Sequence, residues 1–183
     1  MRAFVAIEVP GKVVDSLVDF QKEIPAAGVD VKLVERENLH VNLKFLGEID
    51  EAQAADVQSR LGKLTLRGGD MAVRGVGAFP SPSRPRVVWA GLMKEHEEIL
   101  EPIAQEVISA LEGIGESDDR PFRAHITLGR VRSNRNLEAL GELLRHNAER
   151  EFGEFKVSEI KLKSSVLAPS GPVYRDMGVF RLG

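Results

Sequence analysis

Two short stretches decide the fold, Leu39-His40-Val41-Asn42-Leu43-Lys44-Phe45 and Arg123-Ala124-His125-Ile126-Thr127-Leu128. Both alternate polar and apolar residues, which is typical of a strand with one face in a core and the other outside it. The polar positions are His40, Asn42 and Lys44 in the first stretch, and Arg123, His125 and Thr127 in the second. We therefore expect each strand to present one imidazole among polar neighbours.

The order of elements around the first stretch is repeated around the second. We expect strands at 2–8, 38–46, 70–79, 86–92, 122–132, 155–166 and 173–182, and helices from Gly11, at 51–64, at 99–112 with Pro102 in its first turn, and at 136–148. His125 follows His40 by 85 positions, and the same offset places Asn42 on Thr127. This predicts an α+β fold in which residues 1–183 form one bilobal domain with two pseudo-symmetric lobes.

Composition narrows the class of protein. The 183 residues include 43% hydrophobic ones, and 25 Lys and Arg face 28 Asp and Glu, for a net charge of −3. This balance argues against non-specific coating of nucleic acid or of membranes, but it leaves room for a local basic groove. Because there is no cysteine, disulfides and thiolate chemistry are excluded. A reducing compartment and a cytoplasmic location are expected, since the apolar run at 4–7 is too short for a signal peptide or a membrane span.

Two imidazoles in matched positions are suited to proton transfer. Imidazole titrates near neutral pH, so one ring can accept a proton from water while the other donates one to a leaving oxygen. Asn42 and Thr127, two residues further on, can donate hydrogen bonds to phosphate oxygens. The alternatives are two structural histidines, or a zinc site, which His40 and Asn42 do not suit as a ligand pair. We expect no metal and no cofactor.

The pattern resembles the paired His-x-Thr/Ser-hydrophobic motifs of the two-histidine (2H) phosphoesterase superfamily, and most closely its RNA 2′,3′-cyclic phosphodiesterase branch, first named 2′-5′ RNA ligases. Further stretches that carry the resemblance are Arg2-Ala-Phe-Val-Ala-Ile, Lys44-Phe-Leu-Gly, Ala78-Phe-Pro, Pro85-Arg-Val-Val-Trp, Phe122 and Gly171-Pro-Val-Tyr. The resemblance implies two antiparallel sheets that face a central groove, with helices outside. It also implies hydrolysis of RNA 2′,3′-cyclic ends to 2′-phosphates, with His40 as proton donor and His125 as proton acceptor.

Several polar side chains extend the predicted site. Asn42 departs from the family pattern, which favours Thr or Ser, so altered phosphate binding is expected there. Arg130 follows the second motif; strict alternation points it away from His125, and a bulge at Gly129 would bring it round. Lys44 and Arg123 are candidate contacts for flanking phosphates. The aromatic side chains that could stack on a base or pack in the core are Phe79, Trp89 and Tyr174.

The expected partner is RNA with a 2′,3′-cyclic phosphate end, including tRNA fragments or nucleotides, bound by a monomer. Two other functions stay open. One is a module that binds an RNA end or a nucleotide without turnover, which the Asn42 departure allows. The other is reversible 2′-5′ ligation of tRNA halves, which microscopic reversibility permits at the same site.

Overall fold

The computed structural model describes residues 1–183 as four α-helices and nine strands. The helices are α1 (Gly11–Ala26), α2 (Glu51–Leu61), α3 (Lys94–Ala110) and α4 (Leu137–His146). The strands are β1 (Arg2–Glu8), β2 (Val31–Leu33), β3 (His40–Glu48), β4 (Gly69–Ser81), β5 (Arg84–Leu92), β6 (Ile126–Val131), β7 (Glu151–Val157), β8 (Glu159–Ala168) and β9 (Gly171–Arg181).

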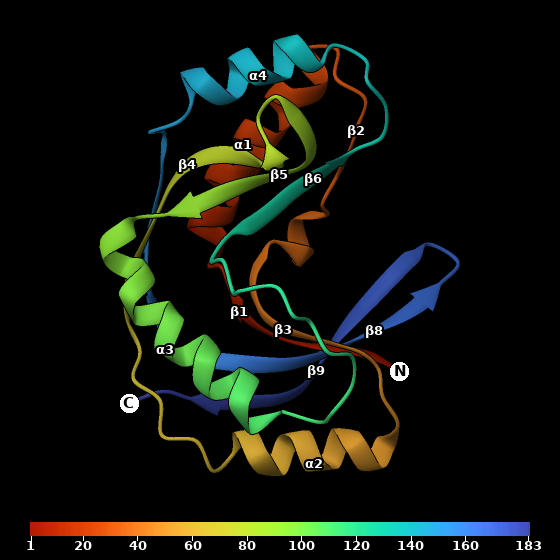
Figure 1. Cartoon of the computed structure of the whole chain (residues 1–183), viewed down its shortest axis with the longest axis vertical. Coiled ribbons are helices and arrows are strands. Elements are labelled where there is room, and N and C mark those ends of the chain that lie inside the picture. Colours follow the sequence, from red (N-terminus) through yellow and green to blue (C-terminus); the bar gives the residue numbers. More distant parts are fainter.

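The strands form one antiparallel path, β7-β4-β5-β6-β3-β1-β8-β9, with β2 beside β6. Figure 1 shows two halves, with β4, β5 and β6 above and β1, β3, β8 and β9 below. The halves are joined where β3 meets β6, through the single registered pair Val41 and Ile126. The expected α+β fold with antiparallel sheets is thus confirmed, and the two sheets are continuous at this point.

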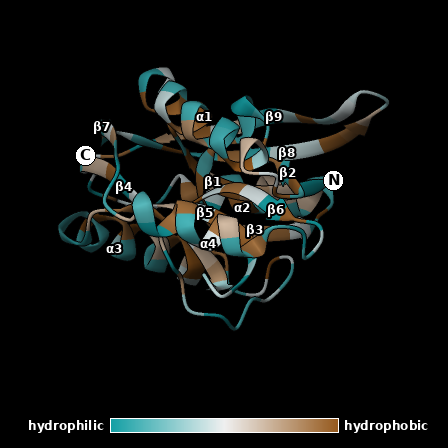
Figure 2. Cartoon of the chain, turned by 90° about the horizontal axis from the view of Figure 1, so that it is seen from above, coloured by the Kyte–Doolittle hydropathy of each residue, from teal (hydrophilic) through white to brown (hydrophobic).

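Helix α1 illustrates why these residues form their element. Val13, Leu17, Phe20 and Ile24 recur at helical spacing and are all buried, at 1% exposure or less. Their burial against the sheet, at about 25 cal/mol per Å² of apolar surface, stabilises the helix in its place. Figure 2 shows that hydrophilic and hydrophobic residues alternate along the helices.

Two helices, α1 and α3, reach from one half to the other. Helix α1 follows β1 in the chain, but it packs on β7, β2 and β6 of the other half, while α3 follows β5 and packs on β3 of the other half as well as on β4. One cluster of buried hydrophobic residues consequently runs through both halves. The packing of α1 and α3 therefore links the two halves.

Three predicted elements are wrong in their bounds. The single strand predicted at 155–166 is two strands, because β7 ends at Val157 and β8 begins at Glu159. Helix α3 begins at Lys94 rather than 99, so Pro102 lies inside it instead of in the first turn. The additional turn is favoured by Glu95 and Glu97, whose charges suit the positive end of a helix dipole. The strand predicted at 122–132 begins only at Ile126. None of the helices combines the length and the hydrophobicity that crossing a membrane requires.

Candidate active site

The junction of β3 and β6 brings the two motifs together. Val41 and Ile126 pair there and are buried, at 1% and 0% exposure. Because side chains alternate along a strand, the residues on either side of this pair point to the opposite face. That face carries His40, Asn42, His125 and Thr127. The four residues predicted to act together therefore lie around one junction.

Each motif contains a register shift at its fourth residue. In β3, Asn42 pairs with Ala6 and Lys44 with Val5, which leaves Leu43 as an extra residue. In β6, Leu128 has no partner in the pairing with β5, so it is the extra residue of that strand. Both leucines are buried, at 3% and 0% exposure. An extra residue of this kind is a β-bulge, which redirects the side chains that follow it.

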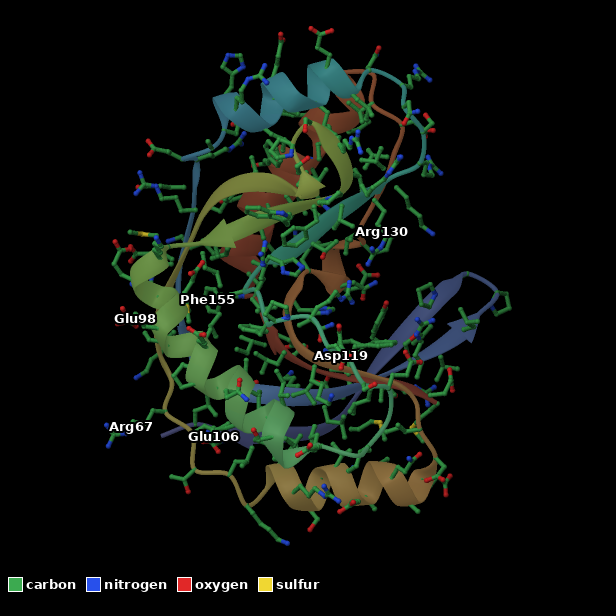
Figure 3. The ribbon with its side chains drawn as sticks, in the orientation of Figure 1. Arg67, Glu98, Glu106, Asp119, Arg130 and Phe155 are labelled. Carbon is green, nitrogen blue, oxygen red and sulfur yellow. The ribbon has the colours of Figure 1, made fainter.

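The bulge at Leu128 brings Arg130 to the histidine face. Thr127 pairs with Trp89 and Arg130 pairs with Val87. Trp89 and Val87 are two residues apart on β5, so they share a face, and so do their partners. Figure 3 shows Arg130 on β6 above the space between the two halves. The bulge that the sequence suggested at Gly129 is thus present, but one residue earlier, at Leu128.

The matching bulge at Leu43 has the opposite consequence for Lys44. Lys44 pairs with Val5 and Asn42 pairs with Ala6, and because Val5 and Ala6 are consecutive on β1, their partners point to opposite faces. The prediction that strict alternation keeps Lys44 beside His40 is therefore wrong, because the bulge reverses the alternation between Asn42 and Lys44. The Lys44 ammonium instead lies close enough to Asp118, in the loop before β6, to lower the pKa of that carboxyl.

Arg123 also differs from its predicted position, because it precedes β6 rather than lying on it. Its side chain is exposed. Its carbonyl oxygen accepts a hydrogen bond from His125 Nδ1, at 2.7 Å. A carbonyl only accepts, so this bond places a hydrogen on Nδ1 and leaves the lone pair on Nε2. His125 is thereby held in the tautomer that a general base needs.

The surroundings of His125 keep its ring neutral. Burial lowers its pKa from the ordinary value; the Arg123 carbonyl raises it, and the charge of Arg130 lowers it again. The edge of the ring contacts Phe79, with the ring centroids 5.0 Å apart at an interplanar angle of 88°. A neutral imidazole at pH 7 with a free Nε2 is able to accept a proton from water.

His40 lies in a more closed environment. Its ring stacks on Phe4, at a centroid distance of 5.0 Å and an interplanar angle of 18°. Burial lowers the pKa of His40 to about 4, and the nearby charge of Lys163 acts in the same direction, while Glu8 and the Asn38 carbonyl raise it. Glu8 is the residue that pairs with His40 across β1 and β3. A carboxylate and an ammonium thus lie near this imidazole, and a guanidinium near the other.

A cluster of four charged side chains adjoins His40, and sequence reasoning missed it. Lys161 Nζ lies 2.7 Å from Glu8 Oε2 and 2.8 Å from Asp176 Oδ2, and Lys163 binds the same two carboxylates. The lysine side chains are only 14% and 8% exposed. These bonds hold the pKa of Glu8 low despite its burial. The sequence does contain a sign of this cluster: Lys161 and Lys163 are two residues apart on a predicted strand, so their side chains share one face.

The site offers proton-transfer groups and anion-binding donors. No cluster of three or more His, Cys, Asp or Glu side chains is arranged to hold a metal ion. Arg130 provides a planar guanidinium that matches two phosphate oxygens. Asn42 and Thr127 add neutral donors on the same face. Two imidazoles that share a face with hydrogen-bond donors are suited to in-line displacement at phosphorus.

Comparison with known proteins defines the class. The model of the LigT-like phosphoesterases matches residues 7–89 and 91–174. The chain belongs to this family, and the resemblance predicted from the motifs is confirmed. Among its relatives is the RNA 2′,3′-cyclic phosphodiesterase of Archaeoglobus fulgidus, which is 40% identical over 181 residues, or 98% of this chain and 99% of the relative. The enzyme of the same name from Methanothermobacter thermautotrophicus is 37% identical over 185 residues, which is 100% of this chain and 99% of the relative.

Solved structures agree on the fold. TT0787 of Thermus thermophilus superposes with a TM-score of 0.76 at 31% identity, covering 100% of this chain and 98% of that one. E. coli LigT complexed with 3′-AMP superposes with a TM-score of 0.78 at 24% identity, covering 99% and 97% of the two chains. Because LigT is only 24% identical to this chain, its similarity supports a shared fold and nothing further. The overall fold of this chain thus has precedents in solved structures.

Proposed function

We propose that this protein hydrolyses the 2′,3′-cyclic phosphate end of RNA to a 2′-phosphate, with His40 and His125 as its acid and base and without a metal ion. The observation that carries the proposal is the junction at Val41 and Ile126, around which both imidazoles share a face. The family membership supports the reaction, since curated relatives that match nearly the whole chain bear the name of this activity.

His125 is the general base in this mechanism. Water attacks phosphorus, and Nε2 of His125 takes the proton, because Nδ1 is already donating to the Arg123 carbonyl at 2.7 Å. The carbonyl also stabilises the imidazolium that results, since its oxygen faces the charged ring. Arg130 and Thr127 bind the non-bridging oxygens, on which negative charge accumulates in the transition state.

His40 is the general acid. As the bond from phosphorus to the ribose 3′ oxygen breaks, His40 donates its proton to that oxygen, and the 2′ ester remains. With a pKa of about 4 in the free protein, His40 is neutral at pH 7. An anionic phosphodiester beside the ring raises this pKa, so substrate and proton bind together. Glu8 assists, because its carboxylate favours the imidazolium form.

The test is incubation with a short RNA that bears a 2′,3′-cyclic end, in the presence of a metal chelator, followed by separation of the phosphate isomers. We expect the 2′-phosphomonoester alone, at a rate that the chelator does not change. Loss of activity in the chelator would overturn the metal-free mechanism, and a 3′-phosphate product would overturn the assignment of the leaving oxygen.

A second candidate is binding of an RNA end without turnover, which Asn42 favours. Its side chain is exposed on the catalytic face where the family pattern has a hydroxyl. An amide still donates, but it is longer and cannot rotate its donor as a hydroxyl can. Tight binding of a cyclic end without product after long incubation would support this function. Ligation of tRNA halves is separated by supplying an RNA with a 5′-hydroxyl and measuring joined product.

We also propose that residues 1–183 act as one bilobal domain, with the two half-chains as structural repeats. The two helices that reach between the halves support this proposal, since α1 packs on β7 and α3 on β3. A domain of this kind unfolds in a single transition. Two separate transitions on heating would contradict it.

A further inference from the structure

A cleft of about 540 Å³ opens beside His125 and is not used by the acid–base mechanism. It lies between the start of α3, the strands β4 and β5, and the segment before β6. Its apolar wall includes Phe79, Trp89 and Phe122, and its charged lining consists of Glu97, Glu101, Arg74 and Arg123. Aromatic surface combined with a few polar groups is typical of a site for a small planar ligand.

Trp89 forms a flat platform in this cleft. A Cβ atom at Gly77 would lie 2.3 Å from its Cζ2, and one at Gly91 would lie 3.2 Å from its Cζ3. Two glycines therefore make room for the indole to lie against the backbone of the sheet. The ring also contacts Phe79, at a centroid distance of 5.4 Å, and Phe79 in turn contacts His125. A continuous aromatic path thus joins the platform to the catalytic imidazole.

Packing alone does not account for an indole at this position. Trp89 Nε1 is buried without a hydrogen-bond partner, which costs free energy that a phenyl ring would not incur. The broad indole face is a good surface for stacking a base, because every base has a π-face of similar size. The position therefore combines an energetic cost to the fold with a large flat surface beside the reaction centre.

Two carboxylates face the same cleft. Glu97 and Glu101 are four residues apart on α3, so they lie on one side of the helix, and neither forms an ion pair. Carboxylates repel the phosphates of RNA, but they accept hydrogen bonds from the amino and imino groups of bases. Guanine presents N1–H and the N2 amino group side by side, which matches the two oxygens of one carboxylate. Uracil presents a single N–H between two carbonyl oxygens.

We propose that this cleft is the base subsite of the enzyme, in which Trp89 stacks on the base at the cyclic end and Glu97 and Glu101 select guanine over uracil. The inference rests on the proposed function, because the cyclic phosphate at His125 is what brings the terminal nucleoside to the cleft. Adenine and cytosine, with one amino donor each, rank between guanine and uracil.

Trp89 is the only tryptophan in the chain, so intrinsic fluorescence reports directly on the platform. The first experiment titrates the protein with guanosine 2′-monophosphate and with uridine 2′-monophosphate. We expect quenching by both and binding of the guanosine compound at least about 10-fold tighter, which corresponds to one well-formed carboxylate contact. Absence of quenching, or equal affinities, would overturn the proposal.

The second experiment compares hydrolysis of short RNAs whose cyclic ends carry guanine or uracil. In the double variant E97Q/E101Q, we expect the guanine preference in kcat/KM to fall to about 2-fold or less, since the paired acceptors are lost. E98Q is the matched control, because Glu98 is outside the lining of the cleft. Figure 3 shows Glu98 at the outer edge of α3. This variant should keep the full preference.

The outcomes separate the subsite from the proposed function. Equal hydrolysis of the two ends by the wild-type protein would refute the subsite and leave the function intact. Selective quenching by the guanosine compound, lost in E97Q/E101Q, without hydrolysis of any cyclic end would refute the function and leave the subsite. Trp89→Leu tests the platform: we expect a decrease in kcat/KM of about 5- to 100-fold from lost stacking, and Trp89→Phe should restore most of it.

Discussion

The His40 strand and the His125 strand share a backbone device but differ in their neighbours. Leu43 and Leu128 form bulges at equivalent places, each at the fourth residue of its motif. The charges nearest the rings differ, however. Glu8 pairs with His40 across the sheet, whereas Arg130 lies on the face of His125. The repeated backbone therefore sets where the rings are, whereas residues that are not repeated set the charges around them, Lys163 and Glu8 at His40 and Arg130 at His125.

The largest effects are expected from removal of either imidazole. In His40→Ala and His125→Ala we expect kcat to fall by about 10²–10⁴, since each ring performs one of the two proton transfers. Measured rates on an RNA with a cyclic end check this. The double variant should be little slower than the slower single variant, because the two rings act as one unit. Full activity in either single variant would contradict the mechanism.

A smaller effect distinguishes the consequences of the two bulges. Arg130→Ala should lower kcat/KM by about 10- to 100-fold, because it removes a charge-assisted contact to phosphate. Lys44→Ala removes a cation from the other motif and should change kcat/KM by less than about 3-fold, since the bulge turns Lys44 from the site. Equal losses in the two variants would show that the register shifts do not control the site.

The same Arg130 variant should also move the pH profile. The charge of Arg130 lowers the pKa of His125, so its removal raises that pKa. A general base must be unprotonated, and the acidic limb of kcat/KM should consequently shift to higher pH. A limb that stays in place in Arg130→Ala would indicate that another group is the base.

Folding stability should depend on pH through His40. Its pKa is about 4 in the folded protein, below the ordinary 6.5. The unfolded chain therefore binds the proton more tightly, and the stability present above pH 6.5 is lost as the pH falls toward 4. At pH 4.5 this amounts to roughly 2 kcal/mol, which His40→Gln should remove from the pH dependence of denaturant unfolding. The same slope in both proteins would contradict the burial of His40.

The smallest effect is expected at the point where the motifs themselves differ. Asn42→Thr gives the first motif the hydroxyl that the second has at Thr127. Both side chains donate to phosphate, so turnover should change by about 3-fold or less. Comparison of kcat and KM on one RNA end checks this. A gain of a hundredfold would show that the amide impairs the site and would favour the binding module.

Sequence reasoning located the two histidines but not the details that distinguish them. Alternation and the offset placed His40 and His125 on facing strands, because burial of Val41 and Ile126 fixes which face is free. Alternation failed at Lys44, since a bulge leaves no mark in a pattern of polar and apolar residues. The tautomer of His125 depends on the backbone carbonyl of Arg123, which no side-chain pattern encodes.

Long-range neighbours were also beyond the sequence. Lys161 and Lys163 bind Glu8 from the far end of the chain. Such pairs depend on the order of strands in the sheet, in which β1 lies between β3 and β8. Local periodicity predicts the strands themselves and leaves this order open. The groups that tune His40 could therefore be identified only once the sheet was known.

The division of roles between the two imidazoles has a direct test. The substrate is an RNA whose 2′,3′-cyclic phosphate carries sulfur in place of the 3′ bridging oxygen, because a thiolate leaves without needing a proton. On this substrate His40→Ala should recover to within about 10-fold of the wild-type rate, while His125→Ala should keep its loss of about 10²–10⁴. Recovery of His125→Ala instead, with His40→Ala still slow, would contradict the account.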